Sequence, residues 1–183
     1  MIGSRSIALA IALCSTMAHV SPAQSCDLVV AALSALSADS TNTVLIDHTV
    51  MGIPLFAFNG YSNSRRGDTA LARAAEPALR ALNKTRAPLP DCFRTQRAWT
   101  VVPDSELVAL FTASGDGWAA FRAHYPNRSQ FAFVSQPIVA GDTATIFVAV
   151  ASGRLAGRGI VLRLIRDATG KWVKQSDVQL WIS

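Results

Sequence analysis

The chain has 183 residues, half of which are hydrophobic, and it carries a formal net charge of +5 at pH 7. That length suits a single domain with a sizeable core, so no second domain is needed. Three cysteines are too few for a structural zinc site of four closely spaced ligands. We expect neither a metal nor a cofactor.

Residues 1–25 have the features of a secretory signal peptide: a short basic start, an apolar run at 7–13, and small residues at Ala23 and Ser25. The apolar run is far shorter than the roughly 20 residues that a membrane-spanning helix needs. We therefore expect cleavage after Ala23 or Ser25. The mature protein should be periplasmic or secreted, with no transmembrane segment.

The exported domain, 26–183, keeps Cys26 and Cys92, because Cys14 lies in the signal peptide. In an oxidising compartment two cysteines most simply pair, so we expect a Cys26–Cys92 disulfide, with two free thiols as the alternative. Lipid attachment to Cys26 is a further alternative. It is disfavoured because Ala23 stands three residues earlier, where a lipidation signal usually has Leu.

Before residue 103 the pattern predicts two helices and two strands. Apolar residues recur at helical spacing in 27–38 and again in the alanine-rich stretch 69–85, where Pro77 is expected to kink or divide the helix. Residues 43–50 are rich in β-branched side chains and predict a strand, and residues 99–102 predict a short one.

Two short helices are predicted next. Pro103 and the acidic residues after it have the chemistry of a helix start. After Gly117 a second helix places Trp118, Phe121 and Tyr125 on one face and ends at the proline that follows. We expect this aromatic face to pack against the strands that come after it.

The stretch from 129 to 183 predicts four strands, at 131–135, 143–151, 159–166 and 172–182. The breaks between them contain turn residues, at Gly141-Asp142, at the glycines 153, 157 and 159, and at 167–170. Such short connections cannot cross over, so neighbouring strands should pair antiparallel. We expect an α+β domain with short helices packed on an antiparallel meander of about four to six strands.

Some of these residues form a pattern: Gly117-Trp118-x-x-Phe121-x-x-x-Tyr125-Pro126, Gly153-x-Leu155-x-Gly157-x-Gly159, Gly170-Lys171-Trp172 and Trp181-x-Ser183. On this pattern the chain resembles a family of small exported bacterial proteins of unknown function, over residues 88–183. The resemblance implies export and supplies no reaction. It gives no support to a redox role for the glycine-rich turn, because Ser152 and Ala156 stand where many relatives have cysteines.

Acid–base chemistry has few candidates, because His48 and His124 are the only histidines after residue 25. Asp47 precedes His48, but adjacent residues on a strand point to opposite faces, so we expect no direct contact between the two. A serine nucleophile such as Ser64 or Ser135 lacks the Gly-x-Ser-x-Gly turn of a nucleophile elbow. We therefore predict no catalytic residue.

Basic charge is the remaining indication of a partner. Arg154, Arg158, Arg163 and Arg166 crowd the glycine-rich turn and the strand after it, and they are the candidate binding residues for an acidic component of the cell envelope. The alternative is a solvated strand face that only aids solubility. Nucleic acid is disfavoured, because the domain is exported and its arginines lack a groove-binding motif.

The sequence favours a non-catalytic exported module that binds or supports another component of the cell envelope, either an acidic molecule or a protein. The small number of acid–base residues and the expected disulfide support that function. The alternative is a small exported hydrolase in which His48 or His124 acts with an aspartate and a serine that the fold brings together.

Overall fold

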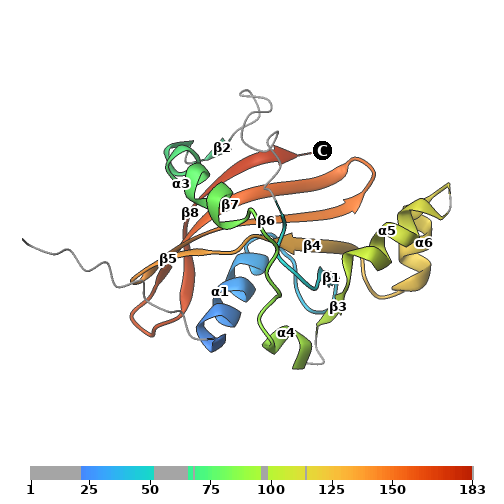
Figure 1. The fold of residues 1–183 in the computed structure, drawn as a ribbon, viewed down its shortest axis with the longest axis horizontal. Coiled ribbons are helices and arrows are strands. Elements are labelled where there is room, and N and C mark those ends of the chain that lie inside the picture. Colours follow the sequence, from blue (N-terminus) through green and yellow to red (C-terminus); the bar gives the residue numbers. More distant parts are fainter. Residues whose placement is uncertain (1–21, 52–65, 68, 96–98, 114, 183) are drawn as a thin grey trace, which may run out of the picture.

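The computed structural model describes residues 22–51, 66–67, 69–95, 99–113 and 115–182. Most of the predicted signal peptide lies outside these residues. Within them the chain forms one mixed β-sheet with helices on both faces and at one end, which confirms the predicted α+β class (Figure 1).

The described strands are β1 (Thr43–Ile46), β2 (Arg66–Gly67), β3 (Thr100–Val102), β4 (Gln130–Val134), β5 (Ile138–Ala140), β6 (Thr143–Gly153), β7 (Ala156–Arg166) and β8 (Trp172–Ile182). The described helices are α1 (Pro22–Ser34), α3 (Thr69–Leu82), α4 (Cys92–Thr95), α5 (Asp104–Thr112) and α6 (Gly117–His124). The strand order is β2-β8-β7-β6-β4-β1-β3, and β5 pairs with β6 outside this path.

The antiparallel part of the sheet contains the four strands predicted in the last third of the chain. β4 pairs with β6, and β7 pairs with β6 on one side and with β8 on the other along most of its length. Gly141 and Gly170, in the turns before β6 and β8, have φ angles of +58° and +80°. Glycine adopts such angles far more readily than other residues. The predicted meander is confirmed, with β5 as an additional short strand.

Two glycines assigned to a turn by sequence lie inside β7 instead. The β6–β7 connection consists of Arg154 and Leu155, whereas Gly157 and Gly159 pair with residues of β6. Trp181 on β8 lies across both glycines, and a β-carbon added to Gly159 would come within 2.2 Å of the Trp181 Nε1 atom. These glycines therefore leave room for an indole ring. The turn assignment is wrong for Gly157, whereas Gly159 lies within the strand predicted at 159–166, which begins earlier than expected.

The other end of the sheet is parallel, which the predicted meander did not include. β1 lies between β4 and β3 and runs parallel to both. Parallel neighbours need long connections, and residues 47–99 and 103–129 supply them. The sheet is therefore mixed, and it has more strands than the predicted range.

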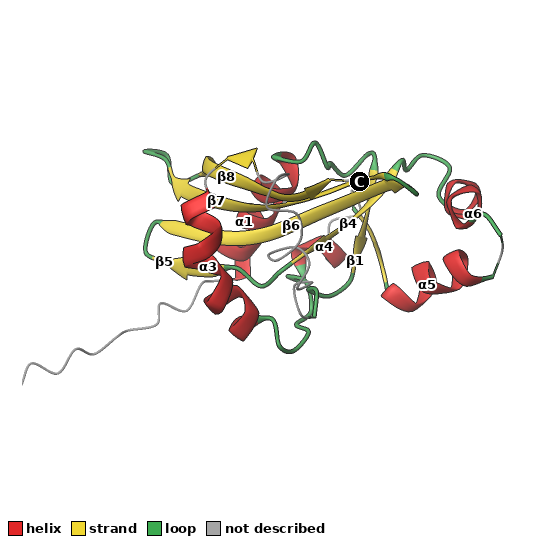
Figure 2. Cartoon of the chain, turned by 90° about the horizontal axis from the view of Figure 1, so that it is seen from above, coloured by secondary structure: helices red, strands yellow, loops and turns green. Residues whose placement is uncertain are grey.

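Helices α1 and α3 cover opposite faces of the sheet (Figure 2). Side chains of α1 share a buried cluster with Ile146 and Leu162, whereas α3 shares another with Phe147 and Val161. Successive residues of a strand point to opposite faces, so the two clusters lie on the two sides of β6 and β7.

The two longer helices agree with the predicted amphipathic stretches, with shifted ends. The helix predicted at 27–38 is α1, which begins and ends earlier, and the helix predicted at 69–85 is α3. Pro77 lies inside α3 without dividing it. None of the described helices has the length and hydrophobicity needed to span a membrane.

Helix α6 carries the predicted aromatic face. Trp118 stacks on Phe131 of β4 with ring centroids 5.5 Å apart, and Phe121 is fully buried beside them. Asp116 caps the helix, because its carboxylate accepts hydrogen bonds from the N–H groups of Trp118 at 3.0 Å and Ala119 at 3.2 Å. The aromatic face packs on β4 as expected, and also on β1 and β3.

Cys26 and Cys92 are placed to form the predicted disulfide. Their Cα atoms are 6.4 Å apart, although 66 residues separate them in sequence. Cys26 lies on α1 and Cys92 begins α4, and both helices pack in the buried cluster on the α1 face of the sheet. The pair therefore joins two helices on one face of the domain.

Candidate functional site

The candidate site lies where β1 and β3 end. Asp47 and His48 follow β1 directly, and Asp104 begins α5 just after β3. Because β1 is parallel to β3 and to β4, the three strands present their carboxyl ends at the same edge of the sheet. Ligand sites of parallel sheets commonly occupy this position.

Backbone hydrogen bonds hold the segment after β1 in place. The N–H of Asp47 donates to the Val102 carbonyl at 2.9 Å. Thr49 and Ala87 exchange two bonds: the Thr49 N–H donates to the Ala87 carbonyl at 2.7 Å, and the Ala87 N–H donates to Thr49 Oγ1 at 3.0 Å. The segment is therefore fixed between the end of β3 and the chain around Ala87, which brings Arg86 to the same edge.

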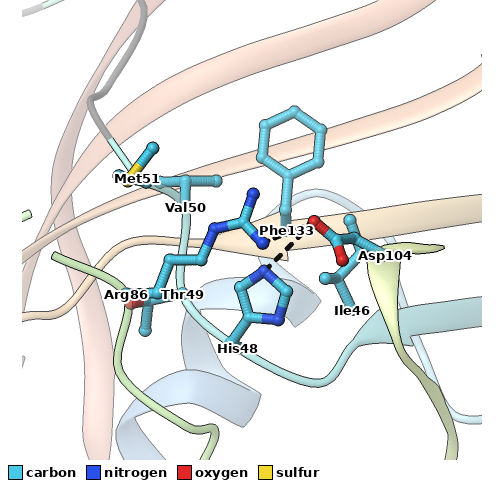
Figure 3. Close-up of a pocket in the computed structure, with 8 residues that line it drawn as sticks. All are labelled: Ile46, His48, Thr49, Val50, Met51, Arg86, Asp104 and Phe133. Carbon is cyan, nitrogen blue, oxygen red and sulfur yellow. Dashed lines mark hydrogen bonds and ion pairs between the residues drawn. The ribbon is translucent and has the colours of Figure 1, made fainter. Parts of the chain in front are cut away.

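Four charged or ionisable side chains meet there, and Figure 3 shows three of them, His48, Arg86 and Asp104. His48 lies between two carboxylates, with Nδ1 2.5 Å from Asp47 Oδ1 and Nε2 3.5 Å from Asp104 Oδ2. The guanidinium of Arg86 donates through Nη1 to the same Asp104 oxygen at 2.5 Å. We call Asp47, His48, Arg86 and Asp104 the His48 cluster. It joins three segments that are far apart in sequence.

The contact between Asp47 and His48 contradicts the expectation that they point to opposite faces. The strand predicted at 43–50 ends at Ile46, so the alternation of side chains along a strand does not extend to these two residues. The backbone of His48 lies outside the named strands and forms an isolated β-bridge with Pro88. Past the strand end, the backbone allows neighbouring side chains to face each other.

The His48 cluster affects the ionisation of Asp104. The hydrogen bond from Arg86, together with its positive charge, holds the pKa of the Asp104 carboxyl below its usual range, and His48 adds a smaller effect in the same direction. Partial desolvation opposes these effects. Asp104 is therefore a carboxylate at neutral pH and accepts hydrogen bonds.

A cavity of about 230 Å³ adjoins the cluster. His48, Thr49, Arg86 and Asp104 form its polar side, and Ile46, Val50, Met51 and Phe133 form its apolar side (Figure 3). An apolar cavity with a few converging polar groups is the usual arrangement of a site for a small molecule. We take this cavity as the candidate ligand site.

The second histidine, His124, belongs to a different group. Its Nε2 atom is 3.1 Å from Glu106 Oε1, and Glu106 also accepts a hydrogen bond from the Tyr125 hydroxyl. Burial and the neighbouring carboxylate raise the pKa of Tyr125. None of these residues is among the described residues that line the His48 cavity. The structure does not bring the two histidines into one site.

The serines considered as nucleophiles do not complete a catalytic group within the described residues. Ser135 is buried; its Oγ accepts a hydrogen bond from the Phe147 N–H at 2.9 Å and donates to the Gln136 carbonyl at 3.0 Å. Ser64 lies outside the described residues. Thr49 is the one hydroxyl residue among the described lining residues of the cavity, and its Oγ1 already accepts a hydrogen bond.

The structure divides the four candidate arginines among three places. Arg154 is exposed in the β6–β7 connection. By strand alternation Arg163 lies on the α3 face of β7, whereas Arg158 and Arg166 lie on the α1 face, roughly 26 Å apart along the strand. Arg166 packs over the ring of Trp172 at 4.4 Å. A single small ligand therefore cannot contact all four.

Arg86 and Asp104 are the site residues that sequence analysis missed. Asp104 was assigned only to a helix start, yet no side chain caps α5 through a hydrogen bond, and the Asp104 carboxylate binds Arg86 instead. One signal was present, because Asp104 follows the strand predicted at 99–102 and His48 lies near the end of the strand predicted at 43–50. That signal predicts a site only if the two strands are parallel neighbours, and the sequence did not predict this pairing.

No protein-family model matches the chain, and it matches neither a curated protein nor a solved structure. Within the described residues, no group of three or more His, Cys, Asp or Glu side chains is arranged to hold a metal ion. A function can therefore be proposed only from the geometry of the site.

Proposed function

We propose that the protein is an exported, non-catalytic binding module of the cell envelope and that the cavity beside the His48 cluster is its ligand site. The observation that carries this proposal is the meeting of Arg86, Asp104 and the Asp47–His48 pair at an apolar cavity. Polar groups that converge on an apolar cavity fix the orientation of a bound molecule.

Two features support export. The first is the signal peptide expected at residues 1–25. The second is the Cys26–Cys92 pair, whose geometry suits a disulfide, a bond that persists in oxidising compartments such as the periplasm. The partner is then a component of the envelope, either an acidic molecule or a protein.

Binding is favoured over catalysis by the surroundings of His48. Both ring nitrogens face carboxylates, Asp47 on one side and Asp104 on the other. A general base needs a nitrogen that is free to accept a proton from water or substrate. In this arrangement neither nitrogen of His48 is directed at open space.

A small exported hydrolase remains the second candidate, and the Asp47–His48 contact at 2.5 Å favours it. An aspartate that accepts a hydrogen bond from Nδ1 orients the histidine of many hydrolases. Asp104 would then have to turn away from Nε2, which it faces at 3.5 Å. This function requires a nucleophile that the described part of the cavity does not supply.

The proposal is tested by thermal shift of the full protein at low salt, with peptidoglycan fragments, anionic glycans, lipid headgroups and nucleotides as probes. A ligand at about a hundred times its dissociation constant adds roughly 2.7 kcal/mol to the free energy of unfolding. We expect His48→Ala to lose the shift. His124→Ala is the matched control, because His124 also contacts a carboxylate but lies outside the cavity lining.

Each outcome decides between the candidates. A shift lost only in His48→Ala supports the binding module. A shift kept in both variants places binding elsewhere, and no shift with any probe contradicts small-molecule binding. The hydrolase is supported instead if the same protein cleaves ester, amide or glycoside probes and loses this activity in His48→Ala but not in His124→Ala.

A further inference from the structure

The guanidinium of Arg86 has hydrogen-bonding capacity that the described part of the chain does not use. Its Nη1 atom donates to Asp104, but Nε and Nη2 make no hydrogen bond to any of the described residues. The side chain is 45 % exposed and lines the cavity. Figure 3 shows the group among the lining side chains, with one nitrogen toward Asp104 and another pointing away from it.

The charge of the cavity restricts the ligand. Asp104 is already paired with Arg86, so the carboxylate of Asp104 does not create an unbalanced negative site. A cationic ligand would therefore have to compete with Arg86 for the Asp104 carboxylate. A neutral ligand would leave donors of the guanidinium without a charged acceptor, whereas a planar carboxylate matches the fork of an arginine.

The apolar side of the cavity restricts the rest of the ligand. Ile46, Val50 and Phe133 face the same space as Arg86, and Met51 beside them is 59 % exposed. A volume of about 230 Å³ is below the usual range for drug-sized ligands, which starts near 300 Å³. The molecule that fits has a short apolar body.

We infer that the cavity binds a small monocarboxylate with a short apolar body, whose carboxylate pairs with Arg86 while the body contacts Val50 and Phe133. This inference rests on the proposed function, which makes the cavity a ligand site. It adds that Asp104 competes with the ligand for the same guanidinium. The ion pair between Arg86 and Asp104 therefore weakens the affinity of the cavity for the ligand.

The test uses 3-phenylpropionate and hexanoate, each compared with its amide and its amine of the same carbon chain, with binding to the full protein measured by calorimetry. We expect the acids to bind and the amides and amines to bind at least tenfold more weakly. Hydrogen bonds between charged groups predict a ten- to hundredfold loss of acid binding in Arg86→Leu. Arg122→Leu, an exposed arginine on α6, should bind as the wild type does.

Asp104→Asn separates recognition from a structural role. If Asp104 competes with the ligand, removal of its charge strengthens binding of the acids, opposite to the effect of Arg86→Leu. If both residues only support the fold, both substitutions weaken binding. Arg86→Lys is the second variant if Arg86→Leu does not fold: it keeps the positive charge, loses the fork, and is expected to bind the acids more weakly than the wild type.

The remaining outcomes distinguish this inference from the proposed function. Equal binding of acid and amide, or preferential binding of the amine, overturns carboxylate recognition and leaves the cavity as a ligand site. Acid binding that is unchanged in both Arg86→Leu and His48→Ala places the carboxylate elsewhere and overturns the inference. Absence of binding by the acids overturns it as well, and if no envelope probe gives a His48-dependent shift, the proposed function fails with it.

Discussion

The antiparallel and parallel parts of the sheet are assembled from the chain in different ways. Strands β5 to β8 come from one continuous stretch, residues 138–182, in which each strand pairs with its neighbour in sequence. The parallel part consists of three strands that lie far apart in the chain, β1, β3 and β4. The His48 cluster forms only at the second kind of assembly, where side chains from distant segments meet at one edge.

The glycine and tryptophan pattern noted in the sequence corresponds to packing at both ends of the sheet. Gly159 leaves room for Trp181, and Trp118 stacks on Phe131. Gly117 allows close approach of Phe111, because a β-carbon there would come 2.4 Å from a ring atom. Such residues identify a fold. The cluster residues lie outside the pattern, so it carries no information about a ligand.

The largest effect is expected from Trp118→Ala at the parallel end. Removal of a buried tryptophan usually costs about 3–5 kcal/mol of unfolding free energy, and Trp118 is buried among Phe111, Phe121 and Phe131. Urea denaturation measures the change. Val108→Ala on α5 is the control, because Val108 is 58 % exposed. An unchanged midpoint for Trp118→Ala would mean that the parallel end contributes little to stability.

A slightly smaller effect is expected when the cysteine pair is removed. A bond between Cys26 and Cys92 closes a loop of 66 residues, which corresponds to about 4 kcal/mol in the chain-entropy model. The double serine variant should therefore unfold at lower denaturant concentration than the oxidised protein. Alkylation of the unreduced protein gives an independent check, and two reactive thiols would contradict the pairing.

Gly159→Ala tests the antiparallel end. The new methyl group would overlap the indole of Trp181, and overpacking of this kind costs about 1–3 kcal/mol. Gly115→Ala is the matched control, because apart from its chain neighbours no described residue has an atom within 4 Å of a β-carbon at that position. Equal thermal midpoints for the two variants would show that Trp181 moves aside freely and that the glycine is not needed for packing.

The smallest expected effect is a change of thermal stability at acid pH. The pKa of Asp104 is lowered mainly by Arg86, and that of Asp167, in the β7–β8 turn, mainly by Thr169. A carboxyl whose folded pKa is lowered adds stability above its unfolded pKa and loses it as pH falls through the folded value. The difference in thermal midpoint between wild type and Arg86→Leu should therefore shrink below about pH 4.

Thr169→Val repeats this test in the antiparallel part, because it removes a hydrogen bond to Asp167 at 2.7 Å. Its midpoint difference from the wild type should shrink over the same pH range. A difference for Arg86→Leu that stays constant from pH 7 to pH 2.5, while that for Thr169→Val shrinks, would show that the Arg86–Asp104 pair does not contribute to stability through its charge.

Local patterns predicted most elements but not the pairing at the parallel end. β6 and β7 are joined by a connection so short that the two strands must pair with each other. The neighbours of β1 depend on where the long connections bring the chain back to the sheet. The hydrophobic periodicity of a segment carries no information about that. Arg86 follows a helix in a proline-containing segment, and nothing local to it indicates that it meets Asp104.

The cysteine pair also bears on how the domain would respond to proteolysis. The loop between Cys26 and Cys92 contains β1, α3, His48 and Arg86. A protease that cuts the chain once inside this loop would leave two fragments joined through sulfur. Nicked protein should then run as one species until a reductant is added, and the segments that supply the candidate site would stay tethered to each other after the cut.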